Sequence, residues 1–238
     1  MRITLLAFAF AGATTYAHAA SLPAIDDYYT FVSAVSANSG TRLLVDKASA
    51  IPAIAGLDST SFLLFDAGAL PGASLAATRQ KAILKLEYDP GLASTLIPAT
   101  SARPLSVSVY GIDGMWDDTV GGSGNLAGID FGIDGSNAYT TTLVRDAGIY
   151  KWDVSDLVDD WIDGTRPLTA LALSGLFGNV NDNDRNAYAS FYAVGATDGA
   201  AASIHLAPIP LPSTAFLLMG AFGAVGATRL RSARHASG

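Results

Sequence analysis

The densest group of side chains that could bind a ligand lies in the segment NVNDNDRN, residues 179–186. Asn181, Asp182, Asn183 and Asp184 offer carboxylate and amide oxygens, which are the ligand atoms that calcium prefers, and the ion takes about six to eight of them. Asparagine and aspartate are also typical of tight turns, because their side chains bond to the nearby backbone. Two interpretations therefore stay open, a calcium site and an Asn/Asp turn, and calcium is the one cofactor that the sequence suggests.

A second candidate site centres on Trp116, which follows a predicted strand and stands beside Asp117 and Asp118. Sugar-binding proteins stack aromatic rings on the apolar faces of sugars and orient the hydroxyl groups with a polar rim. Trp116 and its two aspartates have this composition, and a core tryptophan at the edge of a sandwich is the other interpretation. The further rings available for such stacking are Tyr28, Tyr29, Tyr139, Tyr188 and Tyr192.

The residue types do not indicate a catalytic site. His18 and His235 lie in the end segments, which leaves His205, and we expect that residue on the surface of the last predicted strand. Two carboxylates can cleave glycosides, but no pair among the aspartates and the lone Glu87 is marked for this role. We therefore predict no enzymatic activity, and cleavage of a polysaccharide remains the second alternative.

The elements that must position these residues are mostly strands. Short apolar or alternating runs are separated by Gly, Pro, Asn and Asp, which is the pattern of a β-sandwich or barrel. Leu105, Val107 and Val109 occupy alternate positions, and they predict one core face for their strand. The predicted strands are 30–35, 41–46, 61–67, 81–89, 105–112, 138–145, 168–175, 187–194 and 202–207.

One segment, residues 152–164, has the period of a helix instead. Its apolar residues recur at helical spacing, Asp153 is placed to cap the start and Gly164 to end it. This pattern predicts a short amphipathic helix, with Trp152 and Trp161 buried against it. The aspartates expected to face water are Asp156, Asp159, Asp160 and Asp163.

The N-terminal residues 1–19 have the composition of a signal peptide. One basic residue precedes an apolar stretch, and Ala17 and Ala19 form an A-x-A cleavage pattern. Residues 20–207 then form one exported domain, long enough to bury a sizeable core. The chain has no cysteine, so no disulfide can stabilise that domain.

The C-terminal residues 208–238 place an apolar run between prolines and arginines. The prolines keep the chain extended, and the uncharged run 213–228 would make a helix of roughly 24 Å, shorter than the ~30 Å hydrocarbon core of a membrane. The arginines of the basic end, 229–234, favour the cytoplasmic side. This pattern predicts a tail held in a membrane. Its basic residues are Arg229, Arg231 and Arg234.

The exported part is strongly acidic. Four of the fourteen basic residues lie in the end segments and no acidic residue does, so ten basic residues face twenty-one acidic ones, a formal net charge of −11. Such a surface repels nucleic acid, and it does not favour anionic polymers except through a bridging cation.

The C-terminal segment resembles the PEP-CTERM sorting domain of Gram-negative bacteria, in the variant with Pro-Leu-Pro in place of Pro-Glu-Pro. The resemblance implies a precursor anchored in the inner membrane, processed near residues 210–213 by an exosortase, a membrane protease linked to extracellular polysaccharide production. The protein would then reach the cell surface or the extracellular matrix. The residues that match the motif are Pro210, Leu211, Pro212 and Ser213.

The exported part resembles the disaggregatase-related, DNRLRE-type domain, a β-jelly-roll family that includes carbohydrate-binding modules. The resemblance implies a jelly-roll sandwich and points to a polysaccharide partner. The motifs that carry it are, in order, Phe65-Asp66, Leu70-Pro71-Gly72, the strand from Ile83 to Leu86, Val109-Tyr110, Trp116-Asp117-Asp118, and Asp153-Val154-Ser155 through Trp161 to Gly164.

These patterns together predict an all-β jelly-roll sandwich with one short amphipathic helix. The expected function is that of an exported, non-enzymatic surface or matrix protein, associated with exopolysaccharide and binding carbohydrate. The alternative is a structural or adhesive surface protein that binds no sugar.

Overall fold

The computed structural model describes residues 20–31, 34–36, 42–46, 59–91, 97–113, 137–175 and 187–209. The chain divides into two units, Met1–Ala207 and Pro208–Gly238, and nearly all described residues lie in the first. The helical elements are the 3-10 turn η1 (Ala67–Ala69), α1 (Leu75–Thr78) and α2 (Ser155–Asp163). The strands are β1 (Ser21–Phe31), β2 (Ala34–Ser36), β3 (Arg42–Asp46), β4 (Ser59–Phe65), β5 (Gln80–Tyr88), β6 (Ile97–Pro98), β7 (Leu105–Gly111), β8 (Thr140–Val144), β9 (Gly148–Asp153), β10 (Ala170–Ser174), β11 (Ala187–Tyr192) and β12 (Ser203–Pro208).

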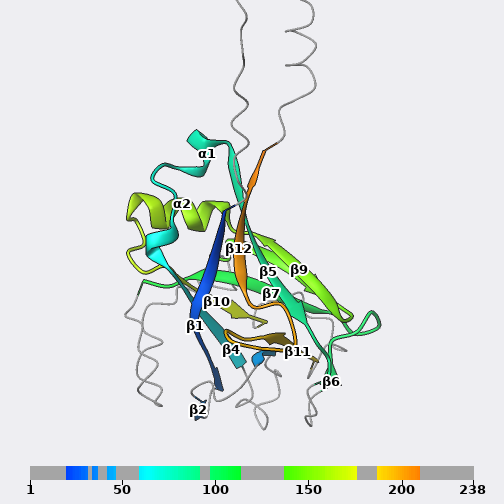
Figure 1. The fold of residues 1–238 in the computed structure, drawn as a ribbon. Helices are drawn as coiled ribbons and strands as arrows, with labels where there is room; N and C mark the ends of the chain where they lie inside the picture. Colours follow the sequence, from blue (N-terminus) through cyan, green and yellow to red (C-terminus); the bar gives the residue numbers. More distant parts are fainter. Residues whose placement is uncertain are drawn as a thin grey trace, which may run out of the picture. The chain divides into compact units, whose positions relative to one another are not determined.

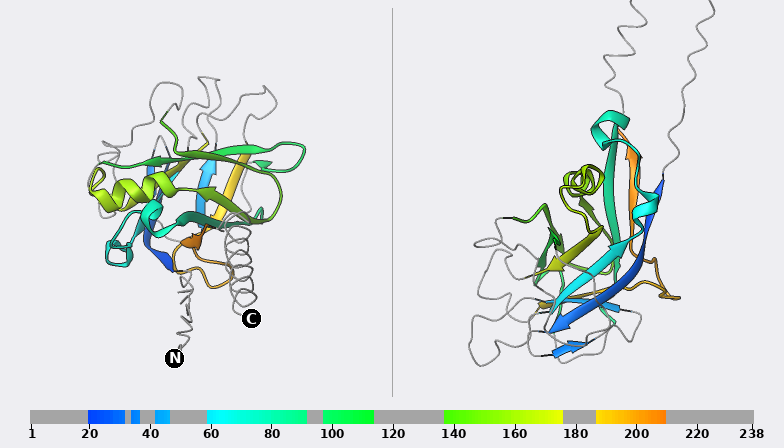
Figure 2. Two further views of the ribbon diagram at one scale, coloured as in Figure 1. Left: turned by 90° about the horizontal axis from the view of Figure 1, so that it is seen from above. Right: turned by 90° about the vertical axis from the view of Figure 1, so that its left-hand side faces the viewer.

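The strands form two layers joined by β1, an all-β sandwich (Figure 1 and Figure 2). Sheet A contains β9, β5, β12, β11, β3 and β6 together with the start of β1. Sheet B contains β2, the rest of β1, β4, β10, β7 and β8. Most consecutive strands lie in different sheets, as in jelly-roll sandwiches, and the exceptions are the end of β1 with β2, β5 with β6, β7 with β8, and β11 with β12. The predicted all-β sandwich is confirmed, and the described residues contain a second short helix, α1, beside the one that the sequence predicts.

Strand β1 passes from sheet A to sheet B through a β-bulge. Its first residues pair with β12, and from Ala24 onward it pairs with β4. The register shifts between Ala24 and Asp26, so Ile25 is the extra residue, and its side chain is 53% exposed. A one-residue shift turns all later side chains to the opposite face. Asp27 therefore points into the sandwich, where it is 6% exposed and accepts a hydrogen bond from the backbone N–H of Val194.

Trp152 on β9 lies in the core between the two sheets. The side chain is fully buried, and its Nε1–H donates to the carbonyl oxygen of Val107 in sheet B at 2.9 Å. The ring meets Phe191 edge-on, with the ring centroids 5.8 Å apart. One side chain thus contacts both layers. The aliphatic residues of the same core include Leu22, Leu63, Leu84, Leu86, Leu171, Leu173 and Ile204.

Strand β7 is buried on both faces, whereas its alternating pattern predicts one core face. Leu105, Val107 and Val109 belong to the main core, as expected. Tyr110 is also fully buried, because a smaller apolar cluster covers the other face of sheet B. The other buried members of that cluster are Phe62, Ile112, Ala170 and Ala172.

Helix α2 packs its apolar stripe against the core, as predicted. Val154 is the N-cap residue and the helix begins at Ser155, so the prediction of Asp153 as N-cap is wrong by one position. The Asp153 carboxylate accepts from the backbone N–H and the hydroxyl of Ser155, at 3.2 and 2.6 Å. The Ser155 hydroxyl oxygen accepts from the backbone N–H of Ala82 at 3.1 Å, which joins the helix start to β5. The buried residues of the stripe are Leu157, Val158 and Trp161.

Gly164 ends α2 in the left-handed region, at φ +80°. A Cβ built on it would have nothing within 4 Å, so a side chain there would meet backbone strain but no clash. We expect Gly164→Ala to lower the free energy of unfolding by about 1 kcal/mol, measured by urea denaturation of the full chain in mild detergent. Gly72→Ala is the matched control, since it also has open space at Cβ and no positive φ. Equal losses in the two variants would contradict the strain argument.

The predicted strands correspond to observed ones with small shifts at their ends, apart from the first. The run 30–35 is the end of β1 and the beginning of β2, and most of β1 is not predicted. Neither β6 nor β9 is predicted. The predicted signal peptide, residues 1–19, and the tail from residue 210 lie outside the described residues. In the described part of the chain, no helix is long and apolar enough to span a membrane.

Candidate functional site

The residues of the two candidate binding sites at 116–118 and 181–184, and those of the processing motifs, all lie outside the described part of the chain, so those assignments stay predictions. Within the described ranges, no three His, Cys, Asp or Glu side chains come together to hold a metal ion. The residues concerned are Ala17, Ala19, Trp116, Asp117, Asp118, Asn181, Asp182, Asn183, Asp184, Pro210, Leu211, Pro212, Ser213, Arg229, Arg231 and Arg234.

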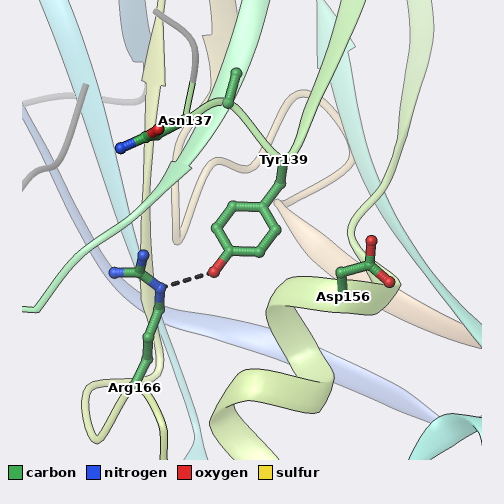
Figure 3. Close-up of a pocket in the computed structure, with 5 residues that line it drawn as sticks. Asn137, Tyr139, Asp156 and Arg166 are labelled. Carbon is green, nitrogen blue, oxygen red and sulfur yellow. Dashed lines mark hydrogen bonds between the residues drawn. The ribbon is translucent and has the colours of Figure 1, made fainter. Parts of the chain in front are cut away.

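An open pocket of about 300 Å³ lies beside α2 (Figure 3). Asn137, Ala138 and Tyr139 line it from the segment before β8. Asp156 comes from the first turn of α2, and Arg166 from the loop after that helix. All of these except Ala138 carry hydrogen-bonding groups. Since ligand pockets have volumes of about 300–1,000 Å³, this one suits a single small polar group, such as one sugar residue of a longer chain.

A network of charged groups holds one wall of the pocket. The Nε–H of Arg166 donates to the hydroxyl oxygen of Tyr139 at 2.7 Å, and the Tyr139 O–H donates to Asp160. The Arg166 Nη1 pairs with Asp113, and the Arg166 side chain is 17% exposed. Such charge-assisted bonds fix a guanidinium in one position. Burial raises the pKa of Tyr139, and the bond to Asp160 adds to this, so the phenol stays neutral.

The position of the Arg166 side chain depends on Gly111 at the end of β7. A Cβ on Gly111 would lie 2.6 Å from Nε and 2.7 Å from Cζ of Arg166, so the guanidinium packs directly on the glycine backbone. The backbone N–H of Arg166 donates to the carbonyl oxygen of Asp160 at 3.0 Å, which closes the turn after α2. The turn and the glycine together direct Arg166 toward Tyr139.

The chemistry available in the pocket is recognition by fixed hydrogen-bonding groups. Asn137 and Asp156 are exposed, and Tyr139 is half-buried with its hydroxyl held between Arg166 and Asp160. A polar ligand would meet an aromatic wall, an amide, a carboxylate and a guanidinium, of which the Tyr139 ring and the Arg166 guanidinium are held in place before it binds. Preorganised groups of this kind lower the cost of ordering the site on binding.

Two rings considered for sugar stacking, Tyr188 and Tyr192, are buried, and the prediction is wrong for both. Tyr188 is 1% exposed and Tyr192 8%, because every residue of β11 is buried. The Arg42 Cζ lies 3.9 Å from the Tyr192 ring centroid, and Arg42 also pairs with Asp89 at 2.9 Å. Tyr139 is the ring that lies in the pocket. The side chains outside the described residues are Tyr28, Tyr29 and Trp116.

The prediction that all four aspartates of α2 face water is wrong for two of them. Asp159 is half-buried and accepts from the backbone N–H of Leu75 at 2.7 Å, at the first turn of α1. Asp160 is half-buried at the Tyr139 hydroxyl. These contacts arise because α1 and the segment before β8 cover that side of the helix. Asp156 and Asp163 are exposed, as predicted.

Glu87 and His205 both lie on the outer side of sheet A. Glu87 accepts from the backbone N–H of Ala200 at 2.7 Å, and His205 shares a hydrogen bond of 3.0 Å with Ser203. Burial lowers the pKa of His205, and the positive charge of Lys85 lowers it further. The expected place of His205 on the surface of the last strand is confirmed.

No family model and no curated protein matches this chain. The sequence names Tyr139 as one ring among six and gives no sign of Asn137 or Arg166 as its neighbours. The residue that Arg166 pairs with, Asp113, is 53 positions away along the chain. No local motif could have connected them.

Proposed function

We propose that this protein is an exported, non-enzymatic component of the cell surface or extracellular matrix that binds carbohydrate. The two end segments support the location: a signal-peptide pattern at 1–19, and a Pro-Leu-Pro tail that ends in arginines. An exosortase-type protease and, transiently, the inner membrane of a Gram-negative bacterium are the partners of the precursor. Polysaccharide is the partner of the mature protein.

The observation that supports the carbohydrate part of the proposal is the pocket beside Tyr139. It combines an aromatic wall with an amide, a carboxylate and a guanidinium, which is the combination that sugar sites use. Its volume of about 300 Å³ suits one sugar residue, and the pocket is open to solvent. The nearby Asp160 accepts from Tyr139 and Asp113 pairs with Arg166, so these two carboxylates hold the pocket wall.

We expect Asp156→Ala, combined with Asn137→Ala, to weaken binding of the preferred glycan at least tenfold. The reason is that each substitution removes a hydrogen-bonding group from the pocket wall, and one charge-assisted bond is worth about 1.5–3 kcal/mol, against the ~1.4 kcal/mol of a tenfold change. A glycan array with the full chain in mild detergent would identify the sugar. Affinity electrophoresis, with calcium and with a chelator, would then measure the variants.

Asp163→Ala is the matched control, because Asp163 is also an exposed aspartate of α2 but does not line the pocket. It should bind within about twofold of the unmodified chain, since it removes no side chain that lines the pocket. Binding of no glycan under either calcium condition would support the structural or adhesive alternative. If the variant with Asp156→Ala and the Asp163→Ala control lost the same amount of glycan affinity, the pocket would not be the sugar-binding site.

A further inference from the structure

The outer side of sheet A collects lysine side chains from two neighbouring strands. Strands β9, β5 and β12 lie side by side (Figure 1), and each alternates between core and outer residues. On β5, Leu84 and Leu86 are buried, so Lys85 between them points outward. We use "outer face" for the outward side chains of these strands. They are Lys81, Ile83, Lys85, Glu87, Ile149, Lys151, Asp153, Ser203 and His205.

Lys85 and Lys151 stand directly opposite each other in the register of β5 and β9. Opposite residues of antiparallel strands share a face, with their Cβ atoms about 4.5–5.5 Å apart, and like charges in this position repel. Neither ammonium group has an ion pair or hydrogen bond with another residue in the described part of the chain. The fold therefore keeps a repulsive pair that nothing in the described residues neutralises.

The outer face is basic in a domain that is otherwise acidic. The chain has four lysines, and three of them, Lys81, Lys85 and Lys151, lie on this face, while residues 20–207 carry a formal net charge of −11. Its two carboxylates, Asp153 and Glu87, keep their negative charge, so the three lysines leave the face with a formal charge of +1. Asp153 pairs with Lys81 at 2.8 Å, and Glu87 accepts the Ala200 amide N–H at 2.7 Å. Neither carboxylate is paired with Lys85 or Lys151, so these two ammonium groups are available to an anion from outside.

We propose that the outer face docks an acidic polysaccharide, with Lys85 and Lys151 closing on one of its carboxylate groups. This inference rests on the proposed function and specifies the polymer as acidic. Two ammonium groups on opposite residues can converge on one carboxylate, which removes their mutual repulsion. The extended face of adjacent strands offers a surface along which a linear polymer can lie.

The net charge of the domain does not exclude this docking. Charges further away than the Debye length, about 8 Å at physiological ionic strength, are largely screened, so a bound carboxylate responds mainly to the lysines next to it. The sequence alone suggests that this acidic domain would bind an anionic polymer only through a bridging cation, because net charge says nothing about how charges are distributed on the surface. The register of β5 with β9 places two lysines side by side, so the surface around them is locally positive.

The test uses affinity electrophoresis of the full chain in mild detergent, without calcium, through gels that contain polygalacturonate or its methyl-esterified, neutral form. We expect retardation by polygalacturonate only, weakened by added salt. The double variant Lys85→Gln/Lys151→Gln should lose at least tenfold in affinity and melt no lower than the unmodified chain, because the substitution removes a repulsion. The control Arg79→Gln/Arg145→Gln removes the same number of charges from exposed positions outside the face and should bind within about twofold.

Three results would overturn the inference. The first is equal binding by the lysine double variant and the unmodified chain. The second is self-association of the chain in analytical ultracentrifugation that the lysine variant abolishes, which would assign the face to a second copy of this chain. The third is retention of a neutral glycan without retention of polygalacturonate. This result would contradict docking of an acidic polymer but would agree with the proposed carbohydrate binding. Failure to bind any polysaccharide, neutral or acidic, would overturn both proposals.

Discussion

Replacing Trp152 with alanine is expected to lower the free energy of unfolding by about 3–5 kcal/mol. Trp152 is fully buried, and its ring packs on Phe191 of sheet A while its Nε1–H bonds to Val107 of sheet B. Alanine would leave a large cavity between the layers and remove the hydrogen bond that joins them. Because whole domains are stable by only about 5–15 kcal/mol, this single change should remove a large part of the stability.

The contribution of the hydrogen bond can be separated from that of packing. Trp152→Phe keeps a ring in the core but loses the N–H, and Trp161→Phe is its matched control, since the buried Trp161 Nε1 has no hydrogen-bond partner in the described residues. Urea denaturation followed by far-UV circular dichroism should show a larger loss for Trp152→Phe, by about 1 kcal/mol. A loss below about 2 kcal/mol for Trp152→Ala would mean that the core refills the cavity.

The sequence predicts the sandwich well where strands alternate and poorly where tertiary context decides. Strand β5 alternates cleanly and is found within a residue of its predicted ends. Strand β1 is missed because Pro23 and the pair Asp26 and Asp27 are uncommon in strands. The chain accommodates them through a bulge at the crossing between the sheets, and this bulge interrupts the alternation of apolar residues by which a strand is recognised.

The candidate site follows even less from the sequence. Its residues come from the segment before β8, from α2 and from the loop after it, and they meet only because β7, β8 and α2 lie together. Tyr139 could be named from its residue type alone. Arg166 could not, because its place is set by the space over Gly111 and by Asp113. The pairing of Lys85 with Lys151 likewise depends on a register between strands that are distant in the chain.

Because the Asp27 side chain points into the core, the stability of the protein should fall as pH rises, which is the opposite of the usual effect of a carboxyl group. Burial raises the pKa of Asp27 from 3.8 to about 6; the Val194 amide opposes this, and the neighbouring charge of Asp26 adds to it. Between those two values the folded state holds a proton that the unfolded chain has released. Stability contributed by this group therefore falls as pH rises from about 4 to about 6, by roughly 3 kcal/mol in total, and is constant above that range.

Asp27→Asn should remove this dependence. An asparagine keeps an oxygen that can accept from the Val194 N–H, and it cannot ionise. We expect the variant to gain stability over the unmodified chain as pH rises from 4 to 7, by up to about 3 kcal/mol. Thermal unfolding of both chains across this range measures the gain, and carbon NMR of the Asp27 carboxyl group measures its titration directly.

Asp163→Asn is a control for which we expect the opposite change of stability with pH. The bonds from Thr165 lower the pKa of Asp163, so its contribution to stability is present at neutral pH and is lost as pH falls through the pKa of the folded state. The Asp163 variant should therefore be less stable than the unmodified chain at pH 7 and approach it in acid. If both variants shifted in the same direction with pH, or if Asp27 titrated at its ordinary value, the bulge would not be holding that carboxyl in the core. Opposite shifts would show that the fold buries the Asp27 carboxyl group at a cost in stability that rises with pH, as its place after the bulge requires.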